Sequence, residues 1–159
     1  MKYAELIEKL QKLGIRMSKR AIQQYASSRF GLIDEPIVQE RGGPAEFTPD
    51  ALADVYAAYH LLHKDKIPYE LIRQARQIGR YLETTSYRAL PDILADTGIR
   101  ELIHNKPKAV FYSFEWLALK YSVMPSKELR IPSGARSALI SLAEKDDYIE
   151  ALQSGEFIE

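Results

Sequence analysis

The chain has 159 residues, of which 46% are hydrophobic. That is enough for one folded domain, or for a small module with an extension. It contains no cysteine, which excludes a disulfide scaffold, a thiolate metal site and a cysteine nucleophile. The formal net charge is zero, which argues against a polybasic tail that coats nucleic acid.

The charges are distributed unevenly. Residues 1–80 hold 13 Lys and Arg against 10 Asp and Glu, whereas residues 81–159 hold 9 against 12. A front half that faces nucleic acid and chance variation explain this distribution equally well. No segment approaches the roughly 20 apolar residues of a membrane span, and the first residues lack the apolar run of a signal peptide. We therefore expect a soluble, cytoplasmic protein without a membrane partner.

The first 26 residues predict two short helices joined by a tight turn. Tyr3, Leu6, Ile7, Leu10 and Leu13 recur at helical spacing, so residues 2–13 are expected to form an amphipathic helix. Gly14 ends it, and Ser18 is suited to cap a second helix that runs to about residue 26. This is the arrangement of a helix-turn-helix unit.

The second helix carries the side chains that most suggest a function. Helical geometry turns Ala21, Ile22 and Tyr25 mostly inward. The residues expected on the exposed face are Lys19, Arg20, Gln23 and Gln24. Lys and Arg supply charge for phosphates, and the amide of Gln pairs with a base edge, preferably of adenine. The alternative is an ordinary solvated helix face.

A short extended region and two further helices follow. Residues 31–47 contain two short apolar pairs, Leu32-Ile33 and Ile37-Val38, followed by a Gly-Gly-Pro turn, which predicts a small β-hairpin or wing. Thr48-Pro49-Asp50 favours a helix start with Thr48 as the cap, and this helix is expected to reach about Lys64. Its expected apolar face consists of Leu52, Val55, Tyr56, Tyr59 and Leu62. Pro68 opens another helix, which continues to about Leu82.

The remaining sequence is also mainly helical in pattern. A short helix is expected from Pro91 to Gly98, and a buried helix over 109–123. A strand over 109–112 is the alternative at the start of that helix. Residues 124–134 read as a loop, and Ser133 caps a last helix. The aromatic residues of this half are expected to be core, with a small-molecule pocket there as the alternative: Phe111, Tyr112, Phe114, Trp116 and Tyr121.

From Leu10 to Ile72 the chain resembles the DNA-binding domain of MerR-type winged-helix regulators. Leu13-Gly14-Ile15 with Ser18-Lys19-Arg20-Ala21-Ile22 is similar to the family's turn and recognition helix. Gly31-Leu32-Ile33 is similar to the segment that leads into the wing. The stretch 46–52, followed by Leu61-Leu62 and 67–72, is similar to the helix pair after the wing.

This resemblance implies a recognition helix in the major groove and a wing on the flanking backbone. Arg20 falls where the family has its groove-facing arginine, and Tyr25 where it has a tyrosine near phosphate. Gln23 and Gln24 replace a common Arg and a common Tyr. The residues expected in the groove are Ser18, Lys19, Arg20 and Gln23, with Gln24 beside them. Those expected on the DNA backbone are Arg16, Tyr25, Arg29 and Arg41.

The chain also departs from the family pattern. Pro44-Ala45 stands where the family has Tyr-Arg, and Arg41 is the candidate replacement. No heptad pattern continues past Leu82, so homodimer formation is an open alternative. His60 and His63, with Asp65 nearby, are the one metal-like spacing, but no third ligand is evident and no metal is expected.

We therefore expect a mainly α protein. Residues 1–80 would form a winged helix-turn-helix module with a small β wing, and residues 81–159 a helical region for oligomerisation or for binding an effector or partner. The expected function is sequence-specific binding of double-stranded DNA, in transcription regulation. The alternatives are an architectural or accessory DNA-binding protein of phage or plasmid type, and a winged-helix module that binds protein instead. No phosphate loop, nucleophile elbow or carboxylate pair is present, so neither an enzyme nor a cofactor is expected.

Overall fold

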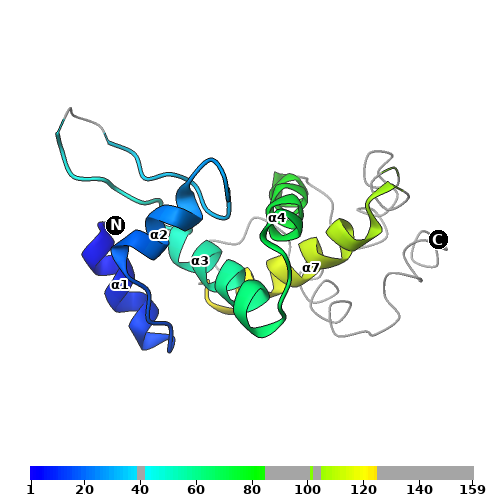
Figure 1. Ribbon diagram of the computed structural model, residues 1–159, viewed down its shortest axis with the longest axis horizontal. Coiled ribbons are helices and arrows are strands. Elements are labelled where there is room, and N and C mark those ends of the chain that lie inside the picture. Colours follow the sequence, from blue (N-terminus) through cyan, green and yellow to red (C-terminus); the bar gives the residue numbers. More distant parts are fainter. Residues whose placement is uncertain (39–41, 85–100, 102–104, 125–159) are drawn as a thin grey trace. The chain divides into compact units, whose positions relative to one another are not determined.

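The computed structural model describes residues 1–38, 42–84, 101 and 105–124, and this part of the chain is mainly helical (Figure 1). The chain divides into two compact units, Met1–Arg73 and Gln74–Glu159. The division lies within helix α4 (Tyr69–Thr84). The elements are α1 (Tyr3–Lys12), α2 (Lys19–Ala26), α3 (Ala51–Tyr59), the π-helix η1 (His60–Lys64), α4 (Tyr69–Thr84) and α7 (Pro107–Ser122).

Helix α1 confirms the expected amphipathic pattern. Leu6 and Leu10 are completely buried. The helix ends where Gly14 takes a φ of +81°, a conformation that costs glycine little because it has no Cβ. The Gly14 N–H donates to the carbonyl of Gln11 at 3.0 Å, so the turn closes on the last residues of α1. Leu13 lies beyond the buried face and is exposed.

Helix α2 begins at the expected cap. The Oγ of Ser18 accepts a hydrogen bond from the backbone N–H of Ala21 at 3.1 Å, which satisfies one of the free donors of the first turn. At the other end, the Ser27 hydroxyl donates to the carbonyl of Gln24 at 2.7 Å. Ile22 is buried, as the sequence predicts, and Tyr25 is buried as well.

In the expected wing region, the described residues 37–38 and 42–46 form an arm that extends away from the helices (Figure 1). Its described residues contain one antiparallel bridge, in which Ile37 and Glu46 exchange backbone hydrogen bonds of 2.8 and 2.9 Å. No strand forms within the described part of the arm. Each side offers only two or three residues, too few to continue a ladder. Residues 39–41, and with them Arg41, lie outside the described residues.

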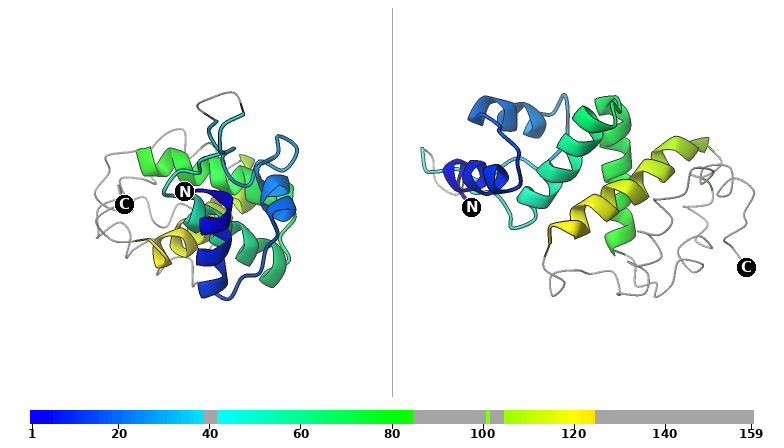
Figure 2. Two further views of the ribbon diagram at one scale, coloured as in Figure 1. Left: turned by 90° about the vertical axis from the view of Figure 1, so that its left-hand side faces the viewer. Right: turned by 90° about the horizontal axis from the view of Figure 1, so that it is seen from below.

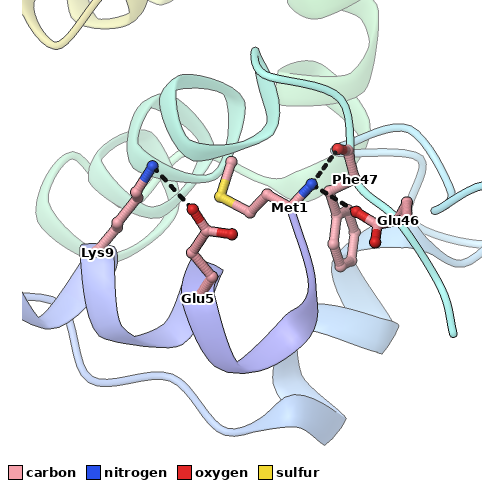
Figure 3. A network of polar contacts seen from close by, with 5 residues as sticks. All are labelled: Met1, Glu5, Lys9, Glu46 and Phe47. Carbon is pink, nitrogen blue, oxygen red and sulfur yellow. Dashed lines mark hydrogen bonds and ion pairs between the residues drawn. The ribbon is translucent and has the colours of Figure 1, made fainter.

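The base of the arm is fixed to the start of α1 (Figure 3). The amino group of Met1 donates to Glu46 Oε2 at 2.8 Å and to the carbonyl of Phe47 at 3.0 Å. The Phe47 ring meets the Tyr3 ring edge-on at a centroid distance of 4.8 Å. The hydrogen bond from the amino group lowers the pKa of Glu46, because it favours the charged carboxylate. On α1 itself, Glu5 and Lys9 form an ion pair at 3.3 Å.

The start of α3 corrects one prediction. Thr48 does not cap the helix through its side chain. Instead, its backbone carbonyl accepts from the N–H of Ala51 at 3.1 Å, and the cap position is held by Asp50, which makes no side-chain cap bond. Thr48, Pro49 and Asp50 therefore form a turn before the helix, so that the backbone takes the role expected of the Thr48 hydroxyl.

The buried face of α3 also differs from the expected one. The expected aromatic and leucine residues Leu52, Tyr56, Tyr59 and Leu62 are only half-buried, although Val55 is completely buried. The buried residues around Val55 are mostly small: Ala51, Ala53, Ala57 and Ala58, with Leu61 following in η1. Helix α1 packs against α3. Small side chains allow two helix backbones to approach closely. A prediction based on hydrophobicity alone selects the larger apolar residues for the buried face and misses these alanines.

Helix η1 continues α3 without a break (Figure 2). The N–H of Asp65 donates to the carbonyl of His60 at 3.2 Å, the bond to the fifth residue back that defines a π-turn. Such turns insert one extra residue into a helix and recur at functional sites. The predicted end of this helix near Lys64 is confirmed.

In the second unit, the C-terminal part of α4 and helix α7 supply the described core. The predicted helix over 109–123 is confirmed as α7, and the strand alternative over 109–112 is wrong. Phe114, Trp116 and Tyr121 are buried, as expected of core aromatics. The predicted elements over 91–98 and 133–152 lie outside the described residues. Within the described residues, no helix has both the length and the apolar character to cross a membrane.

Candidate nucleic-acid interface

Positive charge is concentrated around α2. From Lys9 to Ile33 the sequence contains six Lys and Arg and no Asp or Glu. These residues comprise the end of α1, the linker, α2 and the loop that follows. The N-terminus of α2 adds the positive end of its helix dipole beside Lys19 and Arg20. The segment therefore presents a local cationic surface on a chain whose formal net charge is zero.

The polar residues of α2 share one side of the helix. Lys19, Arg20, Gln23 and Gln24 are all exposed, whereas Ile22 and Tyr25 are buried. Residues four apart stand above one another on a helix, so Lys19 lies next to Gln23, and Arg20 next to Gln24. The structure thus brings the two cations and the two amides together on one face, as the sequence predicts.

The two cations of this face differ in their surroundings. Lys19 Nζ lies 4.9 Å from the centre of the Tyr3 ring, within the range of a cation–π contact. Arg20 makes no hydrogen bond or ion pair with any residue of the described part of the chain. Its guanidinium is therefore available for a ligand that offers two acceptors, such as a guanine edge or a phosphate.

Ser18 holds α2 through its hydroxyl, and its replacement tests that role. Ser18→Ala should lower the free energy of unfolding by about 1 kcal/mol, because one helix N–H loses its partner. Urea unfolding followed by far-ultraviolet circular dichroism measures this change. Ser28→Ala is the matched control, since Ser28 is exposed and caps no helix. A loss no greater than that of the control would show that the cap contributes nothing.

Tyr25 occupies a different position from the one expected of a phosphate contact. Its side chain is only 7% exposed, and its hydroxyl has no hydrogen-bond partner among the described residues. Burial, and next the proximity of Tyr59, raise the pKa of Tyr25 to about 12. Tyr25 is therefore a core residue that anchors α2. A tyrosine can donate to a DNA phosphate only if its hydroxyl reaches the surface, and the side chain of Tyr25 is buried. It is therefore not included among the proposed contacts.

The expected backbone-contacting arginines lie on both sides of α2. Arg16 is exposed in the linker between α1 and α2. Arg29 is exposed in the loop after α2, where its guanidinium lies 5.6 Å from the centre of the Phe30 ring. The carbonyl of Arg29 accepts a hydrogen bond from Arg73 Nη1 at 3.3 Å. Arg73 was not expected from the sequence, since nothing in the local pattern links residues 44 positions apart.

The histidines do not form a metal centre within the described residues. His60 Nδ1 lies 3.6 Å from Asp65 Oδ2, and the His63 ring packs on Tyr59 at a centroid distance of 4.5 Å. No group of three metal-ligating side chains occurs in the part of the chain that the structure describes.

The arrangement around α2 combines two chemical capacities. Exposed arginine and lysine side chains can neutralise phosphates, and exposed amides can donate to and accept from a base edge. Carboxylates, which would repel a phosphate backbone, are absent from this stretch of sequence. Comparison with protein-family models, curated proteins and solved structures finds no match for this chain, so the side chains themselves are the basis for any assignment of function.

Proposed function

We propose that the chain is a sequence-specific binder of double-stranded DNA that acts in transcription regulation. In this proposal, α1 and α2 form a helix-turn-helix unit and α2 is the helix that enters the major groove. Arg20, Gln23 and Gln24 read bases, while Arg16 and Arg29 contact phosphates on either side. The arm takes the place of a wing beside the duplex.

One observation supports this proposal above the others, namely the exposed face of α2. A capped, acid-free helix displays two cations and two amides on one side and buries its apolar residues on the other. A merely solvated helix has no need to exclude carboxylates, and mixed signs are usual on such surfaces. Readout by Arg and Gln at the major groove requires this combination of residues.

Selection of bound sites from a random pool of duplex DNA tests the proposal with the full chain. Enrichment of a consensus sequence is the expected result, with adenine and guanine contacts matching the amides and Arg20. A two-fold symmetric consensus would further indicate a dimer, because protein symmetry is mirrored in half-sites. A pool that yields no consensus would contradict sequence-specific binding.

Arg20→Ala should weaken binding to the selected site by about 1–3 kcal/mol and relax the preference at one base position. The reason is the loss of a bidentate contact rather than of charge alone. Gel-shift titration of mutant and wild type measures the change. Lys12→Ala is the control, because it removes an exposed positive charge from α1 and leaves α2 intact. If the two substitutions weaken binding equally, Arg20 contributes only non-specific electrostatic attraction and makes no contact with a particular base.

A second candidate function is the binding of a protein partner, and the apolar side chains of the arm support it. Ile37 is 55% exposed and Val38 is 53% exposed, and apolar side chains gain nothing from contact with a phosphate backbone. They suit a protein partner instead. DNA affinity that is absent, or that falls only slightly with salt, would favour this function, because phosphate contacts produce a steep dependence on salt.

A further inference from the structure

The first unit contains a cavity of about 410 Å³ next to α2. It is lined by residues of the linker before α2, of α2 itself, of the loop that follows, and of the segment where α3 passes into η1. Sites that bind small molecules in proteins have volumes of about 300–1,000 Å³ and mainly apolar walls with a few polar groups. The cavity agrees with this description in both size and composition.

Aromatic rings form much of its wall. Tyr25 and Phe30 line the cavity from α2 and the loop after it, and Tyr59 and His63 line it from α3 and η1. The Tyr59 and His63 rings are 4.5 Å apart, with an angle of 43° between their planes. Rings of this kind favour a flat, unsaturated ligand, since stacked and edge-on contacts both need a second ring.

Arg16 is the one Lys, Arg, Asp or Glu among the lining residues, so the only formal charge of the wall is positive. Arg16 brings a guanidinium to the cavity, His63 an imidazole, and Gln24 an amide. No Asp or Glu belongs to the lining. A guanidinium binds a carboxylate through two parallel hydrogen bonds. A ligand with a carboxylate next to an aromatic ring would therefore match both the Arg16 guanidinium and the aromatic rings of the lining.

The π-turn of η1 forms part of the cavity wall. It supplies His63 and Leu62 to the lining. A π-turn is less stable than the regular helix around it and is kept mostly where it serves a function. His63, whose imidazole belongs to the lining, lies within this π-turn.

We propose that this cavity binds a small planar aromatic carboxylate, with its ring against Phe30, Tyr59 and His63 and its carboxylate on Arg16. The proposal does not depend on DNA binding, because it concerns affinity for a small anion by the protein alone. Each of its parts, the ring and the charge, can be removed separately from the ligand or from the protein.

The test uses 2-naphthoate as the probe and its neutral amide, 2-naphthamide, as the matched comparison. Binding to the full chain is measured by NMR titration. We expect 2-naphthoate to bind and to shift signals of α2 and η1, and we expect the amide to bind about ten-fold or more weakly. Absence of 2-naphthoate binding, or equal binding of the two compounds, would overturn the proposal.

Two variants and a control locate the site. Arg16→Gln should remove the preference for the anion and leave binding of the amide nearly unchanged. Ala21→Leu should weaken binding of both compounds, because Ala21 lines the cavity and the larger leucine side chain would occupy part of its space. Arg20→Gln is the matched control, since Arg20 is exposed on the same helix but does not line the cavity. Loss of 2-naphthoate binding in this control would place the anion elsewhere and overturn the assignment. So would an unchanged preference for 2-naphthoate over its amide in Arg16→Gln.

Discussion

Replacing Trp116 with alanine is expected to lower the free energy of unfolding by about 3–5 kcal/mol. Trp116 is completely buried in α7, and truncation leaves a large void that its neighbours fill only in part. Urea unfolding followed by far-ultraviolet circular dichroism measures the loss. Tyr112→Ala is a useful comparison, because the Tyr112 side chain on the same helix is only half-buried and its loss should cost less.

Gly79 provides a sharper test of the packing around Trp116. A Cβ placed at Gly79 would lie 2.5 Å from Trp116 Cε3 and 2.8 Å from Cζ3. In the wild type, Gly79→Ala should therefore be destabilising, because overpacking costs about 1–3 kcal/mol and the gain in helix propensity returns at most about 1 kcal/mol. In the Trp116→Ala background the clash is gone, so the same substitution should stabilise. Destabilisation in both backgrounds would contradict the close approach of Gly79 to Trp116.

Glu83→Ala is expected to destabilise the second unit by about 3–5 kcal/mol, as found when one partner of a buried ion pair is removed. Lys120 Nζ lies 3.0 and 3.1 Å from the two carboxylate oxygens of Glu83. The side chains of Lys120 and Glu83 are only 3% and 13% exposed. Without the carboxylate, the ammonium of Lys120 would remain buried beside the Trp116 ring, 4.9 Å from its centre.

The control for this pair is its replacement by apolar residues of similar size. Glu83→Leu combined with Lys120→Met should recover most of the stability lost in Glu83→Ala, since neither charge then requires compensation. Chemical denaturation, followed by the fluorescence of the single tryptophan, gives both values. A Glu83→Ala protein as stable as the wild type would show that the ion pair does not form in solution.

The α2 residues that we propose to contact DNA illustrate what a local pattern can predict. The exposed face of Lys19, Arg20, Gln23 and Gln24 follows from helical spacing and from the apolar positions 21, 22 and 25 on the opposite side. The structure places all four on the surface, as expected. Tyr25 could not be assigned in this way, because tyrosine suits both a core position and a phosphate contact. Only the packing of α2 on the rest of the unit buries it.

The cavity beside α2 gives the opposite example. Its lining comes from residues 16 to 63, and no local pattern joins Arg16 to His63. The sequence did draw attention to His60 and His63, but as a metal-like spacing. The available signal for a π-turn is weak, because its extra residue does not alter the composition of the helix. Side chains from the linker, α2, the loop after it and the α3–η1 segment must assemble before the cavity exists.

The sequence by itself determined where the described helices run, where α1 stops at Gly14 and how Ser18 caps α2, because each depends on neighbours within a few residues. The tertiary structure alone decided which residues are buried on α3, how Tyr25 is placed, and that Glu83 meets Lys120 across 37 positions. Such features depend on which distant segments approach one another. Burial and the pairing of distant side chains arise only when these segments pack together, so they cannot be deduced from the individual residues.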